Sequence, residues 1–343
     1  MNHNLKGIMA AGLLASALVA AMSGPAMAFL SCQVTDLGGV DDKSFNQTAW
    51  KGMQDAQKTL SVDAKLLESK NEADYAANIN SFLSQKCDII VTVGFLLGDA
   101  TKKAAAANPN TKFSIVDFAY EPAVPNILGQ VFQTDQAAFL AGYLAAGVSR
   151  TGTVGTFGGL NIPTVTVFMD GFYSGVQYYN KAKGKSVKVL GWDPAKKTGL
   201  FTNNFNSLDD GRAFAKNLNE EGADVVMPVA GPVGLGSAAL AKELGQAKLK
   251  IIGVDADQYV TDPEKKGVYL TSVLKLMDTT VVAAIKQAKE GTFKGGVVVG
   301  TLANGGVGIA PFHDLDSAVP ADLKKEVEDI RQGIISGKIS VKG

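Results

Sequence analysis

The stretch Cys32–Asn46 reads CQVTDLGGVDDKSFN and contains the change of pattern that decides the fold. Its first residues, Cys32–Asp36, have β-branched residues at their centre, which is typical of a short buried strand. Two glycines then permit a tight turn, and the acidic residues Asp41 and Asp42 are suited to cap the amino end of a helix. The stretch therefore predicts a strand, a tight turn and a helix that begins near Phe45.

The same alternation of strand and helix patterns continues along the chain. From residue 30 onward, short β-branched runs alternate with segments whose apolar residues recur every three or four positions. This order is typical of parallel strands joined by crossover helices. Strands of a first sheet are predicted at Cys32–Asp36, Ala64–Leu67, Asp88–Val93, Phe113–Phe118 and Ile127–Phe132. Strands of a second sheet are predicted at Thr153–Phe157, Val187–Leu190, Asp224–Val229 and Lys250–Val254. The sequence therefore predicts an α/β fold with two doubly wound parallel-sheet lobes.

Two later strands, predicted at Val268–Leu274 and Gly296–Thr301, decide how the lobes are connected. We expect the segment Val268–Val273 to return to the first sheet, so that the chain crosses between the lobes several times. Several crossings form a hinge about which two packed sheets can rotate. The crossings are expected near Phe132–Asp135, Val254–Asp257 and Gly300–Gly308. In the last of them, Asn304-Gly305 fits an ordinary hairpin turn slightly better than a hinge.

These crossings give the expected domain boundaries. The amino-terminal lobe would contain residues 29–131 and about 256–298. The carboxy-terminal lobe would contain residues 132–255 and about 299–343.

The first residues predict export. A basic start leads into the apolar run Ile8–Met22, and an A-x-A pattern ends at Ala28. This order is typical of a secretory signal peptide, here residues 1–28, cleaved after Ala28. A membrane anchor would need ~20 uninterrupted apolar residues, and Ser23–Pro25 breaks the run. Lipid attachment at Cys32 is the weaker alternative, because the residues before it fit that modification poorly. We therefore expect a periplasmic protein.

Composition excludes several functions. The chain has 33 basic and 33 acidic residues, so its charge does not indicate nucleic acid or a membrane surface as a partner. After residue 28 it contains only two cysteines, Cys32 and Cys87, and one histidine, His313. Catalytic triads and histidine-based zinc sites are therefore nearly excluded, and no cofactor is expected. The two cysteines precede or open strands that are neighbours in a doubly wound sheet, which favours a disulfide over two buried thiols.

Polar and aromatic residues follow the predicted strands at the edge where ligands of open α/β sheets bind. Asp36 ends the first strand, and Phe45 and Asn46 begin the helix after it. Amide and carboxylate groups at such a site reject ligands that cannot pair with them. We expect Asn46 to read the edge of a flat ligand, together with Asp117 or Asp135.

Six segments, in order along the chain, resemble one protein family. They are Val34–Gln47, Ala138–Ala146, Gly158–Pro163, Gly222–Val226, Gly253–Gln258 and Leu270–Lys275. The chain is similar to the basic membrane protein family of ABC-transporter receptors, also called the purine nucleoside receptor A family. The resemblance implies a type I periplasmic-binding fold and delivery of a nucleoside to an ABC permease and its ATPase.

The resemblance also implies how the ligand is held. In this family aromatic rings enclose the base, and an aspartate and a lysine hold the ribose. Phe45 matches the first ring and Phe205 the second, Asp255 matches the aspartate and Lys275 the lysine. Gly231 matches a glycine beside the sugar, although the proline after it departs from the family pattern.

The chemistry of these residue types agrees with those roles. Each of two enclosing rings contributes roughly 1–3 kcal/mol of stacking to any base. A carboxylate such as Asp255 can accept hydrogen bonds from both ribose hydroxyls, and Lys275 would neutralise it. The plainer roles are a helix cap for Asp255, solvation for Lys275, and core packing for Phe45 and Phe205.

Other functions share parts of this pattern. The segment Asp36–Asp42 resembles the calcium-binding loop of nucleoside hydrolases, which activate water on a hard cation, but Lys43 beside it disfavours a metal. A flavin or another planar ligand would fit two aromatic walls as well as a purine does. A sensor that hands its ligand to a signalling receptor would have the same sequence features. We expect a monomeric binding protein, not an enzyme.

Overall fold

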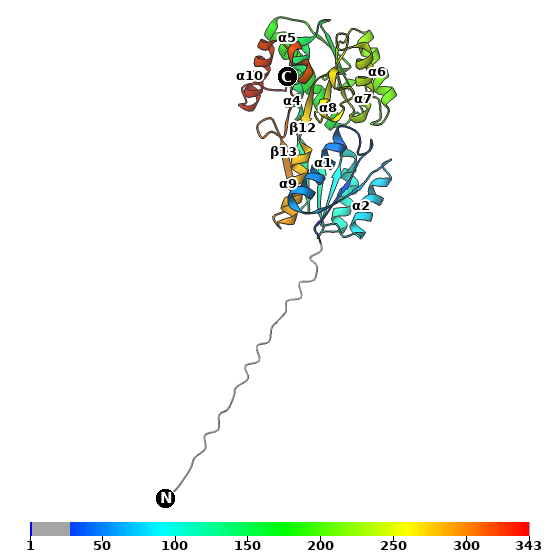
Figure 1. The fold of residues 1–343 in the computed structure, drawn as a ribbon, viewed down its shortest axis with the longest axis vertical. Coiled ribbons are helices and arrows are strands. Elements are labelled where there is room, and N and C mark those ends of the chain that lie inside the picture. The colour runs from blue at the N-terminus through cyan, green and yellow to red at the C-terminus, as the bar shows by residue number, and fades with distance from the viewer. Residues whose placement is uncertain (2–27, 343) are drawn as a thin grey trace.

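A computed structural model describes residue 1 and residues 28–342 of the chain. The predicted signal peptide and its apolar run fall outside these residues. The described residues form two α/β lobes, one above the other in Figure 1. Each lobe is built on one six-stranded sheet, as the alternating pattern predicts. The predicted fold class is therefore confirmed.

The sheet of the first lobe is parallel throughout. From one edge to the other its strands are β13 (Gly296–Gly300), β5 (Ile127–Phe132), β4 (Lys112–Val116), β3 (Ile89–Val93), β1 (Leu30–Val34) and β2 (Asp63–Leu67). Helices α1 (Phe45–Leu60) and α9 (Met277–Lys289) cover one face, and α2 (Asp74–Ser84) and α3 (Gly98–Ala107) cover the other. Apolar residues every three or four positions, such as Ala49, Met53 and Ala56 of α1, form the buried face of these helices.

The sheet of the second lobe has one antiparallel edge. Its strands, in order, are β14 (Val307–Ile309), β12 (Tyr269–Lys275), β11 (Lys250–Asp255), β10 (Val225–Val229), β6 (Thr153–Gly158) and β7 (Lys188–Leu190). Strand β14 runs antiparallel to β12, and the other pairs are parallel. Helices α4 (Thr134–Val148), α5 (Pro163–Lys183) and α10 (Ala321–Ile335) share the core on one face, and α6 (Leu208–Glu220) and α7 (Gly234–Leu244) lie on the other.

Glycines let α4 and α5 pack unusually close together. A side-chain carbon added at Gly142 would lie 2.1 Å from the carbonyl oxygen of Phe172, and one added at Gly175 would lie 2.0 Å from that of Phe139. Real side-chain carbons do not approach carbonyl oxygens so closely, so these positions require glycine. The close contact buries α4 on nearly all sides.

Short elements complete the fold. A small hairpin of β8 (Trp192–Asp193) and β9 (Thr198–Gly199), which the sequence analysis did not predict, follows β7. The remaining helices are single turns or little more. They are η1 (Phe95–Leu97), η2 (Gly231–Val233), α8 (Gln258–Thr261), η3 (Lys266–Val268) and η4 (His313–Ala318).

The position of β12 corrects the predicted connections. We expected Val268–Val273 in the first sheet, but β12 pairs with β11 and β14 in the second. After β11 the short α8 turns the chain back beside its own sheet, where Leu270 and Val273 join the second lobe's core. The predicted crossing at Val254–Asp257 is therefore wrong, and the chain crosses after β12 instead.

The three crossings in the structure lie between β5 and α4, between β12 and α9, and between β13 and β14. The first and third lie where the sequence analysis expected them. Because β13 and β14 belong to different sheets, the turn around Asn304-Gly305 joins the two lobes and is not a hairpin. The expected boundary at 256 for the first lobe's second segment therefore moves to the start of α9.

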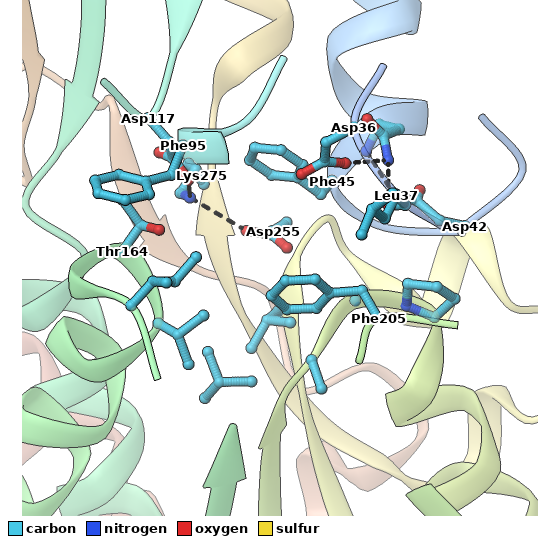
Figure 2. Close-up of a pocket in the computed structure, with 18 of the residues that line it drawn as sticks. Asp36, Leu37, Asp42, Phe45, Phe95, Asp117, Thr164, Phe205, Asp255 and Lys275 are labelled. Carbon is cyan, nitrogen blue, oxygen red and sulfur yellow. Dashed lines mark hydrogen bonds and ion pairs between the residues drawn. The ribbon is translucent and has the colours of Figure 1, made fainter. Parts of the chain in front are cut away.

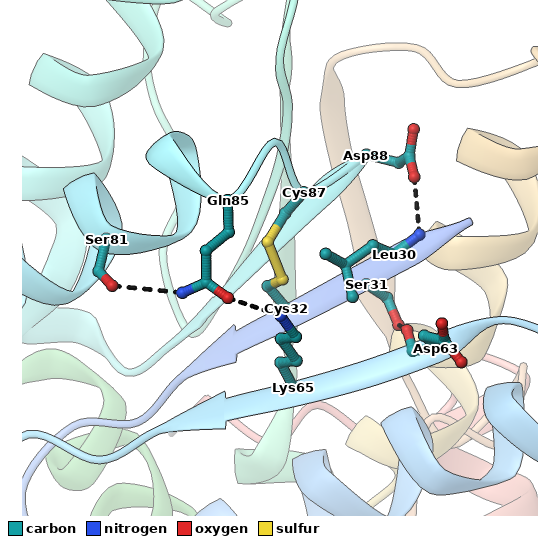
Figure 3. Close-up of a disulfide and its surroundings, with 9 residues drawn as sticks. All are labelled: Leu30, Ser31, Cys32, Asp63, Lys65, Ser81, Gln85, Cys87 and Asp88. Carbon is teal, nitrogen blue, oxygen red and sulfur yellow. Dashed lines mark hydrogen bonds between the residues drawn. A yellow bond between two sulfur atoms is a disulfide. The ribbon is translucent and has the colours of Figure 1, made fainter. Parts of the chain in front are cut away.

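A disulfide joins Cys32 of β1 to Cys87, just before β3, with 6.1 Å between their Cα atoms (Figure 3). The two strands are direct neighbours in the sheet. The backbone N–H of Leu30 donates to Asp88 Oδ2 at 2.7 Å, which holds the same two chain segments together. This bridge lies near the amino ends of the strands, opposite to the edge where Asp36 follows β1.

Candidate functional site

A cavity lies between the lobes at the carboxyl ends of both sheets (Figure 2). Its atom-free space, counted together with the open solvent at its mouth, is about 570 Å³. The first lobe lines it with Asp36, Leu37, Asp42, Phe45, Asn46, Phe95, Leu96 and Asp117. The second lobe lines it with Ile162, Thr164, Val165, Phe168, Phe205, Val229, Ala230, Gly231, Pro232, Val254, Asp255 and Lys275. We call it the interlobe cavity.

Two aromatic rings enter the interlobe cavity from opposite lobes. Phe45 is the first residue of α1, and Phe205 lies in the loop between β9 and α6. Figure 2 shows the two rings on opposite sides of the space that contains Asp255. Both rings are only half-buried, unlike core phenylalanines, so they can cover the faces of a planar guest.

A buried charge cluster lies beside these rings. Lys275 Nζ is 2.7 Å from Asp117 Oδ2 and 3.7 Å from Asp255 Oδ1, and all three side chains are less than one-tenth exposed. Burial alone would lower the pKa of Lys275, but the two carboxylates raise it above its ordinary value. The lysine therefore stays charged and pairs a residue of the first lobe, Asp117, with one of the second, Asp255.

The two aspartates adopt an unusual backbone conformation. Asp117 directly follows β4 with φ +67°, and Asp255 ends β11 with φ +68°. Aspartate tolerates this left-handed region better than most residues, although it remains costly. Such strain is typical of residues whose side chains must point in a direction that function requires.

A second polar group lies where β1 ends. Asn46 Nδ2 donates to Asp36 Oδ1 at 2.9 Å, while Asn46 Oδ1 is buried without a hydrogen-bond partner in the described part of the chain. Burial, and the nearby carboxylates Asp42, Asp117 and Asp255, raise the pKa of Asp36 well above its ordinary value. The pair can therefore offer a ligand an acceptor on Asn46 and, when Asp36 is protonated, the hydroxyl of its carboxyl group.

Asp42 has a structural role as well. Its carboxylate accepts the backbone N–H groups of Ser44, Asn46 and Gln47 at 2.7 to 3.0 Å, which caps the start of α1. The sequence analysis named Asp41 or Asp42 as this cap. The cap fixes the turn that presents Phe45 and Asn46 to the interlobe cavity.

The lobes touch across the cleft. Ser44 Oγ lies 2.9 Å from the carbonyl oxygen of Val254 and 3.0 Å from Asp255 Oδ2. Thr261 Oγ1 donates to the carbonyl oxygen of Lys43 at 2.6 Å. Both contacts join the turn after β1 to the second lobe, so the structure shows the cleft closed.

Seven of the eight predicted ligand-binding residues line the interlobe cavity, namely Asp36, Phe45, Asn46, Phe205, Gly231, Asp255 and Lys275. Asp135 does not. It lies in the first turn of α4 beside α5, in a separate depression with Asp170 and Lys342. The backbone of Asp135 packs against Gly171, which directs this turn away from the cleft.

Phe95, Thr164 and Phe168 are among the lining residues that the sequence analysis missed. Phe95 follows β3, so the rule that placed Asp36 after β1 could have found it. Thr164 and Phe168 belong to the amino-terminal half of α5. Their spacing in a helix gives no sign that they face a ligand, because Phe168 also packs in the core of the second lobe.

Two sheets whose carboxyl ends enclose a cavity, joined by three crossings, are the architecture of two-lobed solute-binding proteins. The comparisons with known proteins identify the family. Residues 29–343 match the model of the Bmp family, described as ABC transporter substrate-binding protein PnrA-like. The chain belongs to this family, as the motifs predicted.

Individual relatives agree with this assignment. The nucleoside-binding protein BmpA of an ABC transporter from Lactococcus lactis subsp. cremoris is 33% identical, with 90% of this chain and 87% of the relative covered. Basic membrane protein A1 from Borrelia garinii subsp. bavariensis is 31% identical, with 89% and 86% covered.

A solved structure shows the same fold. It is an ABC transporter solute-binding protein from Aeropyrum pernix K1, 28% identical with a TM-score of 0.81, and the match covers 91% of this chain and 92% of that one. Among the described residues, no helix combines the length and apolar character needed to cross a bilayer.

Proposed function

We propose that this ABC transporter substrate-binding protein binds a nucleoside, with a purine preferred, in the interlobe cavity. Its ligand would pass to a membrane permease that an ATPase drives. The observation that carries the proposal is the placement of two rings from opposite lobes, Phe45 and Phe205, beside the buried cluster of Asp117, Asp255 and Lys275. The lactococcal relative described as nucleoside-binding supports it.

The rings would hold the base. Each contributes roughly 1–3 kcal/mol of stacking and accepts any flat heterocycle. Selection among bases would then rest on Asn46 and Asp36. A base N–H can satisfy the unpartnered Asn46 Oδ1, and a neutral Asp36 can donate to a carbonyl oxygen or ring nitrogen.

The charge cluster would hold the ribose. Asp255 can accept from two neighbouring hydroxyls, and each such charge-assisted bond contributes roughly 1.5–3 kcal/mol. Lys275 pairs with this aspartate and can donate to the sugar itself. Because Asp117 comes from the other lobe, ligand contacts here also favour the closed arrangement.

In the segment Asp36–Asp42, which resembles the calcium-binding loop of nucleoside hydrolases, the acidic side chains Asp41 and Asp42 make contacts within the protein. Asp42 caps α1, and Asp41 forms an ion pair with Lys43. Within residue 1 and residues 28–342, no three metal-ligating side chains gather in a group that could hold an ion. A planar ligand such as a flavin is the alternative that the rings alone leave open.

Transport also requires export and a partner. We propose that the signal peptide predicted before residue 29 directs the chain to the periplasm, where a monomer would dock on the permease. Cleavage after Ala28 would leave Phe29 and Leu30 at the start of β1. Amino-terminal sequencing of the exported protein would test this point.

The direct experiment identifies the ligand. Protein purified without added ligand is denatured, and the released small molecules are analysed by mass spectrometry. Calorimetry with a panel of purine and pyrimidine nucleosides and riboflavin then ranks affinities, and solution scattering measures closure. A nucleoside that binds with a Kd below ~10 μM and compacts the protein supports the proposal. Binding of riboflavin alone, or of no member of the panel, contradicts it.

A further inference from the structure

The interlobe cavity has two distinct ends. Figure 2 shows Asp36, Leu37 and Asp42 at one end and Phe95 with Thr164 at the other, and Lys275 lies between the two ends. If the base stacks at the first end and the ribose meets the charge cluster, the second end faces whatever the sugar carries on its far side. The residues at that end therefore decide how long a ligand can be.

The ring of Phe95 is held firmly in place. It belongs to η1, which follows Gly94 with φ +120°, and a side-chain carbon at Gly94 would lie 2.4 Å from Asp36 Oδ2. Behind it, the centroid of the Phe118 ring lies 5.2 Å from that of Phe95, and the ring of Tyr120 lies 4.8 Å from that of Phe118. The partly buried Phe118 therefore backs the Phe95 ring, and the buried Tyr120 backs Phe118.

The last of these rings is anchored as well. Tyr120 Oη donates to the carbonyl oxygen of Gly98 at 2.7 Å, and this tyrosine is buried. A side-chain carbon at Gly98 would lie 2.5 Å from the Phe118 ring, so α3 is packed directly against it. Packed side chains therefore support the wall that Phe95 presents to the interlobe cavity, and a longer ligand that displaced this wall would disrupt their contacts.

Charge at the interlobe cavity disfavours an anionic group there. Besides Asp36, whose pKa is raised, three acidic side chains line it, namely Asp42, Asp117 and Asp255, against one cation, Lys275. That lysine is already paired with two of the carboxylates. Among the described residues that line the interlobe cavity, no second lysine or arginine could neutralise a phosphate.

We propose that Phe95 is a specificity-determining residue that ends the interlobe cavity, so that the sugar must terminate in a small neutral group. The inference rests on the proposed function and deepens it. An unmodified nucleoside ends in one hydroxymethyl group, which fits beside Phe95 and Thr164. A flavin carries a longer polyol chain, which would meet the Phe95 wall, and a nucleotide carries a phosphate, which the carboxylates repel.

The test compares variants on matched ligands. Calorimetry measures the Kd of the nucleoside that the wild type binds best, its 5′-O-benzyl ether, its 5′-monophosphate and riboflavin. The variants are Phe95→Ala and Phe95→Leu. Phe205→Ala is the control, because it removes a ring that stacks on the base and leaves Phe95 in place. Thermal melting of each ligand-free variant reports whether it folds.

In the wild type the parent nucleoside should bind roughly 100-fold tighter than its benzyl ether, because a large group forced against the wall displaces packed side chains. Phe95→Ala should reduce this ratio to less than about tenfold, and Phe95→Leu should give an intermediate ratio. Phe205→Ala should weaken both ligands by a similar factor and keep the ratio. The monophosphate should bind poorly to all variants.

The outcomes separate the two proposals. If the wild type binds no nucleoside, the proposed function fails, and the role of Phe95 fails with it. If it binds nucleosides but neither Phe95 variant changes the ratio between parent and benzyl ether, only the role of Phe95 is refuted. Tight binding of the monophosphate by the wild type would contradict the charge reasoning.

Discussion

Replacing Asp255 by asparagine should weaken nucleoside binding strongly while leaving the fold intact. Asparagine has nearly the same size, and it tolerates the left-handed backbone that Asp255 adopts at φ +68°. It offers one acceptor oxygen where the carboxylate offers two, and that acceptor is neutral. One ribose hydroxyl would lose its charge-assisted bond, worth roughly 1.5–3 kcal/mol, and the other would keep a weaker one of about 1 kcal/mol.

The expected loss is therefore about 2–5 kcal/mol, or a Kd raised roughly 30- to 5,000-fold. A matched control lies two residues further on. Asp257 contacts His313 Nε2 at 2.8 Å and caps α8, and it does not line the interlobe cavity. Asp257→Asn should change the Kd less than about threefold, because a partly exposed pair contributes little.

Calorimetry at one pH, with the nucleoside and its 2′-deoxy analogue, measures the loss of affinity and the preference for the 2′-hydroxyl. The wild type should prefer the ribonucleoside, and Asp255→Asn should lose most of that preference, because the missing hydroxyl and the missing charge belong to the same contact. Thermal melting of the ligand-free proteins should agree within a few degrees. Equal affinities for wild type and Asp255→Asn, or an unchanged preference for the 2′-hydroxyl, would refute the assignment of Asp255 to the sugar.

Three further predictions concern stability and closure. Replacing Cys32 and Cys87 by serine should lower the free energy of unfolding by roughly 2–4 kcal/mol, because the bridge spans 55 residues. Urea unfolding measures this loss. Calorimetry should give an unchanged Kd, and a shifted Kd would contradict the prediction. Burial raises the pKa of Asp42 to about 7, so the folded protein binds a proton that the unfolded chain releases near its ordinary pKa of 3.8. As the pH falls from 7 toward 4, Asp42 should raise the free energy of unfolding by on the order of 1 kcal/mol per pH unit. Denaturant titrations at several pH values should show that Asp42→Asn removes this part of the pH dependence. The same pH dependence in both proteins would count against the prediction. Thr261→Val removes the bond to Lys43 across the cleft, so solution scattering of the nucleoside-bound variant should show a larger radius of gyration than that of the nucleoside-bound wild type. Equal profiles of the two bound proteins would show that this bond does not hold the cleft closed.

The rule that ligands bind beyond the carboxyl ends of parallel strands worked because it depends only on the local sequence pattern. Asp36 and Asn46 could be placed at the ligand edge because a parallel sheet collects the carboxyl ends of its strands on one side. The same reasoning reaches Phe95 after β3. It fails for Asp135, since that residue follows a crossing and α4 starts in the other lobe.

The sequence by itself determined the fold class, the family and most of the residues at the interlobe cavity, because strand and helix periodicity and short motifs are properties of neighbouring positions. Tertiary structure alone decided that β12 stays with β11, since apolar strand residues such as Leu270 and Val273 can be buried equally well in either sheet. It alone brought Lys275 to Asp117, 158 positions away in the chain, and placed three rings in a row behind the cavity wall. Contacts between residues so distant in sequence depend on how the two lobes pack and close, which no local pattern encodes.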